Sequence, residues 1–159
     1  MFSHVIGFDD APFARAHRGD VLLVGAVFSG PRLDGVVSGR IRRDGVNSTR
    51  TIIDLLRASR FLDQLQLVLL QGIAFGGFNV VDIHTLYRTL GLPVLVVARK
   101  PPDLARIRDA LFNQVPGGRR KWRLIEQAGA MEPAGEVMVQ RAGLTLAEAE
   151  SAVKRWAIH

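Results

Sequence analysis

The first forty residues alternate apolar runs with short polar breaks, the pattern of β-strands in a half-buried sheet. The runs cover residues 5–8, 21–29 and 33–41. Only Gly30-Pro31-Arg32 separates the second run from the third. Because this link is too short for a crossover, the two strands should be antiparallel. The pattern therefore predicts a three-stranded antiparallel meander.

Helical spacing and short, wholly apolar runs alternate after the meander. A helix should begin at residues 47–49, where Asn, Ser and Thr can each cap it. Residues 68–70 and 93–98 have the composition of buried strands, and the residues between them predict a helix over 79–90 that a glycine ends. This unit of strand, helix and strand predicts parallel pairing with a right-handed crossover.

The last third of the chain predicts two more helices with a basic segment between them. The first helix covers residues 101–112, and the basic segment 119–123 follows and leads into a strand near 123–125. The final helix should begin at a capping box, in which Thr145 and Glu148 satisfy each other's backbone amides. Its apolar positions lie along one face, as expected of a helix that packs on a sheet.

The order of these elements is that of an α/β protein with an RNase H-like fold: a three-stranded antiparallel meander followed by parallel strands with flanking helices. A doubly wound parallel domain is the competing fold. It would need a helix between the first two strands, whereas residues 10–19 contain a proline and show no helical face. We therefore predict a single RNase H-like domain over residues 1–159.

The composition fits that size. With 159 residues, 48% of them hydrophobic and 23% charged, the chain can bury the core of one domain. It contains no cysteine, which excludes disulfides and cysteine zinc sites and favours the reducing cytoplasm. No apolar run approaches the roughly 20 residues of a membrane helix, and the first ten residues do not resemble a secretory signal. We expect a soluble cytoplasmic protein without a membrane partner.

The charge balance is compatible with nucleic acid. Lys and Arg number 21 against 15 Asp and Glu, which gives a net charge of +6 and a sequence pI of about 10.9. An exposed arginine surface with no anionic partner explains the same numbers equally well. Within the basic segment 119–123, Trp122 could stack on a base or simply anchor the segment in the core.

Three candidate residues should meet where strands of this fold end. RNase H-like nucleases hold divalent ions with carboxylates from separate strand ends, because hard cations need oxygen ligands. Asp9 and Asp44 follow the first and third strands, and Gln71 follows strand 68–70. Asp9 is favoured over Asp10 because successive strand residues point to opposite faces. The alternative for Asp9 and for Asp44 is that each only caps an ordinary solvent-exposed turn.

A glycine-rich turn follows Gln71 and is the candidate substrate-binding segment. Its glycines let backbone amides approach a ligand, and a helix beginning near its end would favour a phosphate. A turn that merely packs closely beneath two phenylalanines is the alternative. Lys100, at the end of strand 93–98, could contact a phosphate at the same edge. The candidate substrate-binding residues are Gly72, Ile73, Gly76, Gly77, Asn79 and Lys100.

The motifs in this order resemble a known family. The segment LVLLQGIAFGGFNVVDIHTLYRTLGLPVLVVARK resembles the endonuclease V superfamily. With IGFDDAPF before it and SGRIRRDGVNST in the middle, the chain is more similar to the archaeal endonuclease dU group, an uncharacterised-protein family. The resemblance covers residues 6–156, and the combination of segments is more specific than any one of them.

This resemblance implies an endonuclease that uses Mg²⁺ or Mn²⁺ to nick DNA near a deaminated base, uracil or hypoxanthine. By the same resemblance, Asp9 corresponds to the first metal-binding aspartate and Asp44 to the second acid, and the third acid falls on Gln71. An amide oxygen can bind a metal but lacks the charge that attracts one. Catalytic residues would then be Asp9, Asp44 and Gln71.

Two other functions remain open at this stage. A non-catalytic protein that binds nucleic acid or nucleotides would keep the pocket and lose the metals. The second alternative is a purely structural role as a partner in a homodimer, although no feature of the sequence favours it. The sequence leaves the oligomeric state undetermined.

Overall fold

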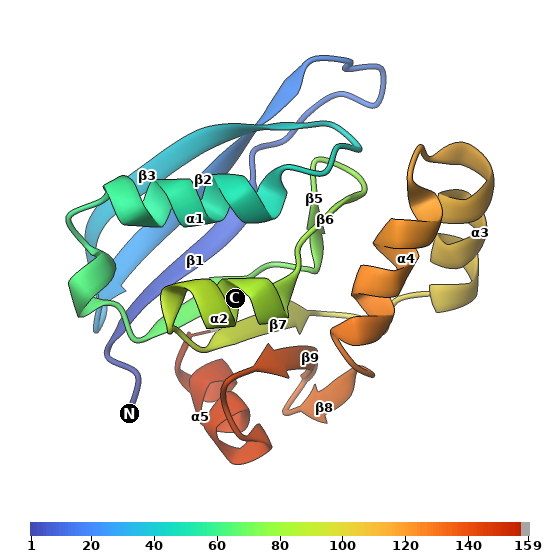
Figure 1. The fold of residues 1–159 in the computed structure, drawn as a ribbon. Coiled ribbons are helices and arrows are strands. Elements are labelled where there is room, and N and C mark those ends of the chain that lie inside the picture. Colours follow the sequence, from blue (N-terminus) through green and yellow to red (C-terminus); the bar gives the residue numbers. More distant parts are fainter. Residues whose placement is uncertain (157–159) are drawn as a thin grey trace.

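A seven-stranded mixed sheet forms the centre of the protein, whose computed structural model describes residues 1–156 (Figure 1). Its strand order is β3-β2-β1-β4-β7-β9-β8, and two short strands form the separate β5–β6 hairpin. The strands are β1 (His4–Asp10), β2 (Asp20–Ser29), β3 (Arg32–Arg42), β4 (Leu67–Leu70), β5 (Ala74–Phe75), β6 (Asn79–Val80), β7 (Val94–Ala98), β8 (Glu132–Ala134) and β9 (Val137–Ala142).

The predicted meander and the parallel strands after it are confirmed. Strand β2 pairs antiparallel with both β1 and β3, whereas β4 lies parallel to β1 and β7 parallel to β4. Strands β1, β3, β4 and β7 therefore all run in one direction and end at the same edge of the sheet. We call this the carboxyl edge, where β1 ends at Asp10, β3 at Arg42, β4 at Leu70 and β7 at Ala98. This is the predicted RNase H-like arrangement.

The two faces of the sheet carry separate hydrophobic clusters, because neighbouring residues of a strand point to opposite sides. Helices α1 (Ser48–Ala58) and α2 (Ile83–Leu90) cover the face that includes Ile6 and Phe8. Helix α5 (Leu146–Trp156) covers the other face, which includes Val5. Figure 1 shows these helices on opposite sides of the sheet. Among the described helices, none has the length and apolar character required to cross a bilayer.

A helical hairpin lies beyond the carboxyl edge. It consists of α3 (Leu104–Gln114) and α4 (Gly118–Gln127), drawn at the right of Figure 1 beyond the end of β7. The predicted strand over 123–125 is wrong, because these residues belong to α4. The buried positions of α4 are Gly118, Lys121 and Ile125, so a lysine occupies the middle of its buried face and hides the helical pattern. An added Cβ at Gly118 would clash with the carbonyl group of Leu111, so the two helices approach closely because residue 118 is glycine.

The capping box that begins the last helix is confirmed. The backbone N–H of Glu148 donates to Thr145 Oγ1 (3.1 Å), and the backbone N–H of Thr145 donates to Glu148 Oε1 (2.9 Å). Two amides that an isolated helix end leaves unpaired are thus satisfied. Strands β8 and β9, which precede this helix, were not predicted, because β8 has three residues and β9 carries Gln140 and Arg141 within its apolar run.

The helix predicted to begin near Asn79 begins four residues later. Asp82 is its N-cap, and the Asp82 side chain accepts a hydrogen bond from the backbone N–H of Thr85 (3.0 Å). Asn79 instead lies in β6 and is fully buried. Its Oδ1 accepts from the backbone N–H of Ser48 (2.9 Å), and its Nδ2 donates to the carbonyl of Arg42 (2.9 Å). Asn79 therefore joins the β5–β6 hairpin to the start of α1.

We expect Asn79→Ala to destabilise the protein by about 2–4 kcal/mol, because it leaves buried backbone groups without partners. Urea denaturation followed by circular dichroism measures the change. The matched control is Asn113→Ala in α3, where the side chain is exposed and the change should be within about 0.5 kcal/mol. An equally small effect at both positions would contradict the structural role of Asn79.

Candidate functional site

Asp9 and Gln71 lie next to each other at the carboxyl edge. The parallel register pairs Phe8 with Leu70, and each candidate residue follows directly. The backbone N–H of Gln71 donates to the carbonyl of Phe8 (3.1 Å), which extends the pairing by one residue. Both side chains are exposed. The structure thus brings these two predicted residues to one solvent-facing position.

The surroundings of Asp9 shift the pKa of its carboxyl group. Its pKa is raised, chiefly because the surrounding chain removes water from the carboxyl group and further because Asp10 adds a second negative charge beside it. The hydrogen bond from the backbone N–H of Asp10 to Asp9 Oδ1 (2.9 Å) opposes this rise. A cation at this position would relieve the repulsion between the two carboxylates.

Asp10 and Asp44 hold the glycine-rich turn. Asp10 Oδ2 accepts a hydrogen bond from the backbone N–H of Gly76 (2.6 Å), and Asp44 Oδ1 accepts one from Phe78 (2.8 Å). The backbone N–H of Asp44 also donates to the carbonyl of Gly76 (2.8 Å). We call this arrangement, in which two carboxylates hold residues 76–78, the carboxylate clasp.

The close approach in the clasp needs unusual backbone conformations. Asp44 has a backbone φ of 52°, which residues other than glycine rarely adopt, although Asp is among the residues that tolerate it. Gly77 has a φ of 81°, and a Cβ there would collide with Asp44 Oδ1. A glycine is therefore required where the turn faces the carboxylate.

Several predicted substrate-binding residues are committed to the framework. The amides of residues 76 and 78 are already bound by carboxylates, so the turn presents fewer free donors than its glycines suggested. Ile73 packs against the core, and its carbonyl accepts from the backbone N–H of Val81 (2.8 Å). The side chain of Asn79 is buried, and its amide oxygen and nitrogen both bond within the protein. Gly72 and Gly77 are less enclosed, and Lys100 is exposed just beyond β7.

Lys121 is a site residue that the sequence interpretation missed. It comes from α4, is 2% exposed, and its Nζ donates to the backbone carbonyl of Asp44. Burial lowers the pKa of Lys121, and the negative charge of Asp44 partly offsets this effect. In the sequence Lys121 lies within a run of five mostly basic residues, and only the helical spacing from Gly118 to Ile125 could have identified it as buried.

A basic cleft lies beside Asp44. Arg43 holds the loop between β1 and β2: its Nη1 donates to the carbonyls of Arg15 (2.6 Å) and His17, and its guanidinium lies over the ring of Phe13. Its Nε is 3.9 Å from Asp44 Oδ2. The resulting cavity of about 450 Å³, which we call the arginine cleft, is lined by Arg15, Ala16, His17, Arg18, Arg43 and Asp44.

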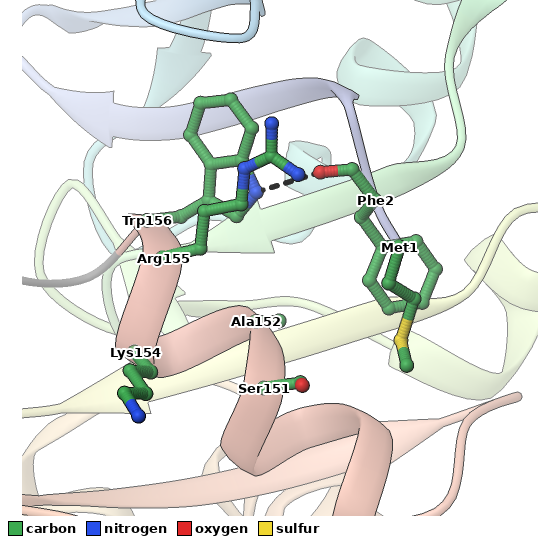
Figure 2. Close-up of a pocket in the computed structure, with 7 residues that line it drawn as sticks. All are labelled: Met1, Phe2, Ser151, Ala152, Lys154, Arg155 and Trp156. Carbon is green, nitrogen blue, oxygen red and sulfur yellow. Dashed lines mark hydrogen bonds between the residues drawn. The ribbon is translucent and has the colours of Figure 1, made fainter.

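Another hollow lies away from the carboxyl edge, between the start of the chain and α5 (Figure 2). It is closed on one side by the hydrogen bond from Trp156 Nε1 to the carbonyl of Phe2 (2.9 Å), drawn as a dashed line. Its described lining includes Lys154 and Arg155 and no carboxylate. We therefore do not assign it to the candidate site.

The acids at the carboxyl edge do not form a dense cluster. Within residues 1–156 no group of three or more His, Cys, Asp or Glu side chains is arranged to hold a metal ion. The structure instead separates two pairs: Asp9 with Gln71 at the ends of β1 and β4, and Asp10 with Asp44 around the glycine-rich turn. The prediction that Asp44 lies near the same edge is met, but one of its carboxylate oxygens is occupied by the turn.

The chain is similar to other proteins in sequence and in fold. A UPF0215 protein of Deinococcus radiodurans is 64% identical over 151 residues, which cover 95% of this chain and 77% of the relative. The crystal structure of a protein of unknown function from Archaeoglobus fulgidus has a TM-score of 0.90 at 35% identity and covers 98% of this chain and 87% of its own.

A more distant likeness concerns the fold. Endonuclease V of Ciona intestinalis, in complex with a 24mer DNA containing an inosine followed by a ribo-adenosine, has a TM-score of 0.57 at 15% identity. The likeness covers 96% of this chain and 77% of that one. The family model described as Endonuclease dU matches residues 2–159. The chain thus belongs to the endonuclease dU family and shares the RNase H-like fold of endonuclease V.

Proposed function

We propose that this protein is a metal-dependent endonuclease that nicks DNA containing a deaminated base, uracil or hypoxanthine. The observation that carries the proposal is the position of Asp9, an exposed carboxylate at the carboxyl edge beside Gln71. Membership of the endonuclease dU family and the fold shared with a DNA-bound endonuclease V support it.

The residues present fit a sparsely held Mg²⁺ or Mn²⁺ ion. Such ions keep several waters and need only one or two protein carboxylates. Asp9 would be the main ligand, and the amide oxygen of Gln71 would be a neutral second ligand. Asp44 would be a weaker ligand than its sequence position suggested. Its Oδ1 accepts a hydrogen bond from the backbone N–H of Phe78, and the positive charges of Arg43 and Lys121 offset its own charge. An ion at Oδ2 would have to compete with Arg43, whose Nε is 3.9 Å from that oxygen.

The residues of the site would have separate roles. A bound divalent ion would supply positive charge to the phosphodiester oxygens during cleavage. Asp9 and Gln71 would fix the position of that charge. Asp44, through the carboxylate clasp, would fix the glycine-rich turn, beside which the base would be received after leaving the stack. Lys121 would hold the backbone of Asp44 in its left-handed conformation.

A nucleic-acid-binding protein without catalysis is the second candidate function. Two observations favour it: Gln71 lacks the negative charge of an acid, and one oxygen of each clasp carboxylate is taken up by the turn. Such a protein would still bind through the arginine cleft, because phosphate contacts need no metal. The two functions therefore differ in their dependence on Asp9.

Purified protein should nick uracil- or hypoxanthine-containing DNA in the presence of Mg²⁺ or Mn²⁺, and Asp9→Asn should reduce the rate roughly 100-fold or more. Loss of even an outer-shell partner of a metal costs about 10- to 100-fold, and a direct ligand should cost at least as much. Gel assays of end-labelled oligonucleotides, single- and double-stranded, measure the rate. The control is Asp54→Asn on the exposed face of α1. No cleavage of any such substrate would remove the endonuclease function, and full activity in Asp9→Asn would remove only the metal assignment.

Gln71→Asp should lower the Mg²⁺ concentration needed for half-maximal cleavage, because it adds a negative charge beside Asp9. The expected decrease is about tenfold, equivalent to about 1.4 kcal/mol of metal binding. The same assay, with Mg²⁺ titrated, measures it, and Gln114→Asp on the exposed surface of α3 is the control. An unchanged or higher requirement would show that Gln71 does not lie against the ion.

Replacing Arg15 and Arg18 together by Ala should weaken DNA binding and flatten its salt dependence. Each lost phosphate contact lowers the slope of log K against log salt by about 0.9 for duplex and about 0.7 for single strands. The expected decrease is therefore about 1.4–1.8. Fluorescence anisotropy in EDTA measures it without cleavage. The control replaces Arg57 and Arg88, which are exposed in the last turns of α1 and α2. Equal slopes for the two double variants would exclude the arginine cleft from the binding path.

A further inference from the structure

A further cavity lies beside the C-terminal half of α4. It has a volume of about 300 Å³ and lies between the start of α3, the C-terminal half of α4, the following loop and β9. We call it the Trp122 cavity. Its wall is largely apolar, and its described lining contains no Lys or Arg; the residues that define it are Leu104, Trp122, Ile125, Glu126, Met131 and Gln140.

One polar group in the wall of this cavity has no partner. Gln140 is 3% exposed, and its Nε2 donates to the carbonyl of Gly129 (2.9 Å), which fixes the orientation of the amide. The opposite atom, Oε1, is the one buried side-chain oxygen or nitrogen within residues 1–156 that has no hydrogen-bond partner. A buried acceptor left unpaired is costly, and such groups are rare in native proteins. The wall therefore holds an acceptor for an N–H or O–H donor.

The chemistry of the wall defines the ligand. Trp122 is partly buried and offers an aromatic surface on which a planar ring can stack. The lack of a lining Lys or Arg makes the cavity unsuited to a phosphate, whereas Gln140 Oε1 suits a ring that carries an N–H. A volume near the lower limit of ligand pockets suits one ring system and not a whole nucleotide. Oε1 is itself buried, so the proposed contact requires side chains of the wall to move, and Trp122 and Met131 are only partly buried.

We propose that the Trp122 cavity binds a nucleobase, which stacks on Trp122 and donates an N–H to Gln140 Oε1. The exposed arginines of α4, Arg119, Arg120 and Arg123, lie on the same helix and would attract the strand that carries the base. This site is separate from the residues of the metal-dependent chemistry, so it requires neither Asp9 nor a metal.

Fluorescence of Trp122 tests this directly. The chain has two tryptophans, so Trp156→Phe leaves Trp122 as the sole tryptophan. In EDTA, adenosine should quench its emission with a Kd on the order of millimolar, as expected for a small ligand. N6,N6-dimethyladenosine, which has lost the N–H of its amino group, should bind roughly tenfold or more weakly, because the acceptor stays unpaired. A single-stranded oligonucleotide should quench at lower concentration than adenosine if the natural source is a strand, and at no lower concentration if it is a free nucleoside.

Gln140→Leu in the same background separates a ligand site from a structural residue. It should abolish the difference between adenosine and its dimethyl analogue while leaving the melting temperature unchanged or higher, because it removes an unpaired buried oxygen and Gly129 is exposed enough for water to bind its carbonyl. The control is Gln127→Leu, at the exposed end of α4. The proposal is overturned if neither adenosine nor the oligonucleotide quenches Trp122. It is overturned equally if Gln140→Leu lowers the melting temperature and leaves quenching intact, which would identify Gln140 as a structural residue whose oxygen is bound to water.

Discussion

The carboxylate clasp determines the geometry of the carboxyl edge. Asp10 and Asp44 lie at or just beyond the ends of β1 and β3, and each carboxylate accepts a hydrogen bond from a backbone N–H of the glycine-rich turn. Hydrogen bonds to charged acceptors are roughly twice as strong as those between neutral groups. The clasp therefore joins the β5–β6 hairpin to the sheet. The start of α1, through Asn79, and α4, through Lys121, are positioned against the same hairpin and loop.

The same bonds divide the acids into two groups with different uses. The charge of Asp44 is offset by Arg43 and Lys121, and its carboxylate holds the glycine-rich turn, whereas Asp9 faces solvent beside the like charge of Asp10. A third acid at position 71 would increase that repulsion in the absence of a cation, and the amide of Gln71 avoids it. A neutral side chain at position 71 attracts a divalent ion less strongly than an acid would. The proposed catalysis therefore depends on the affinity of the site for the metal.

Helix α4 connects two parts of the surface with different chemistry. Consecutive residues of a helix are separated by about 100° around its axis, so Lys121 can face Asp44 while Trp122 faces the second cavity. This explains the composition of the basic segment. Its buried lysine supports the loop after β3, its tryptophan lines a cavity, and its arginines remain exposed. One short helix thus contributes residues to both the proposed metal site and the proposed nucleobase site.

The meander, the parallel strands β4 and β7 and the last helix could be predicted from the amino-acid sequence, because their apolar periodicity and capping residues are local properties. The sequence also placed Asp9, Asp44 and Gln71 at one edge, since strand direction follows from the length of the connections. The groups that those side chains contact could be identified only from the three-dimensional structure. The hydrogen-bond partners of four side chains lie between 11 and 77 positions away in the sequence; these side chains are Asp10, Asn79, Lys121 and Gln140. Hydrogen bonds of that kind leave no periodic pattern in the chain, because they depend on where distant segments meet in the fold.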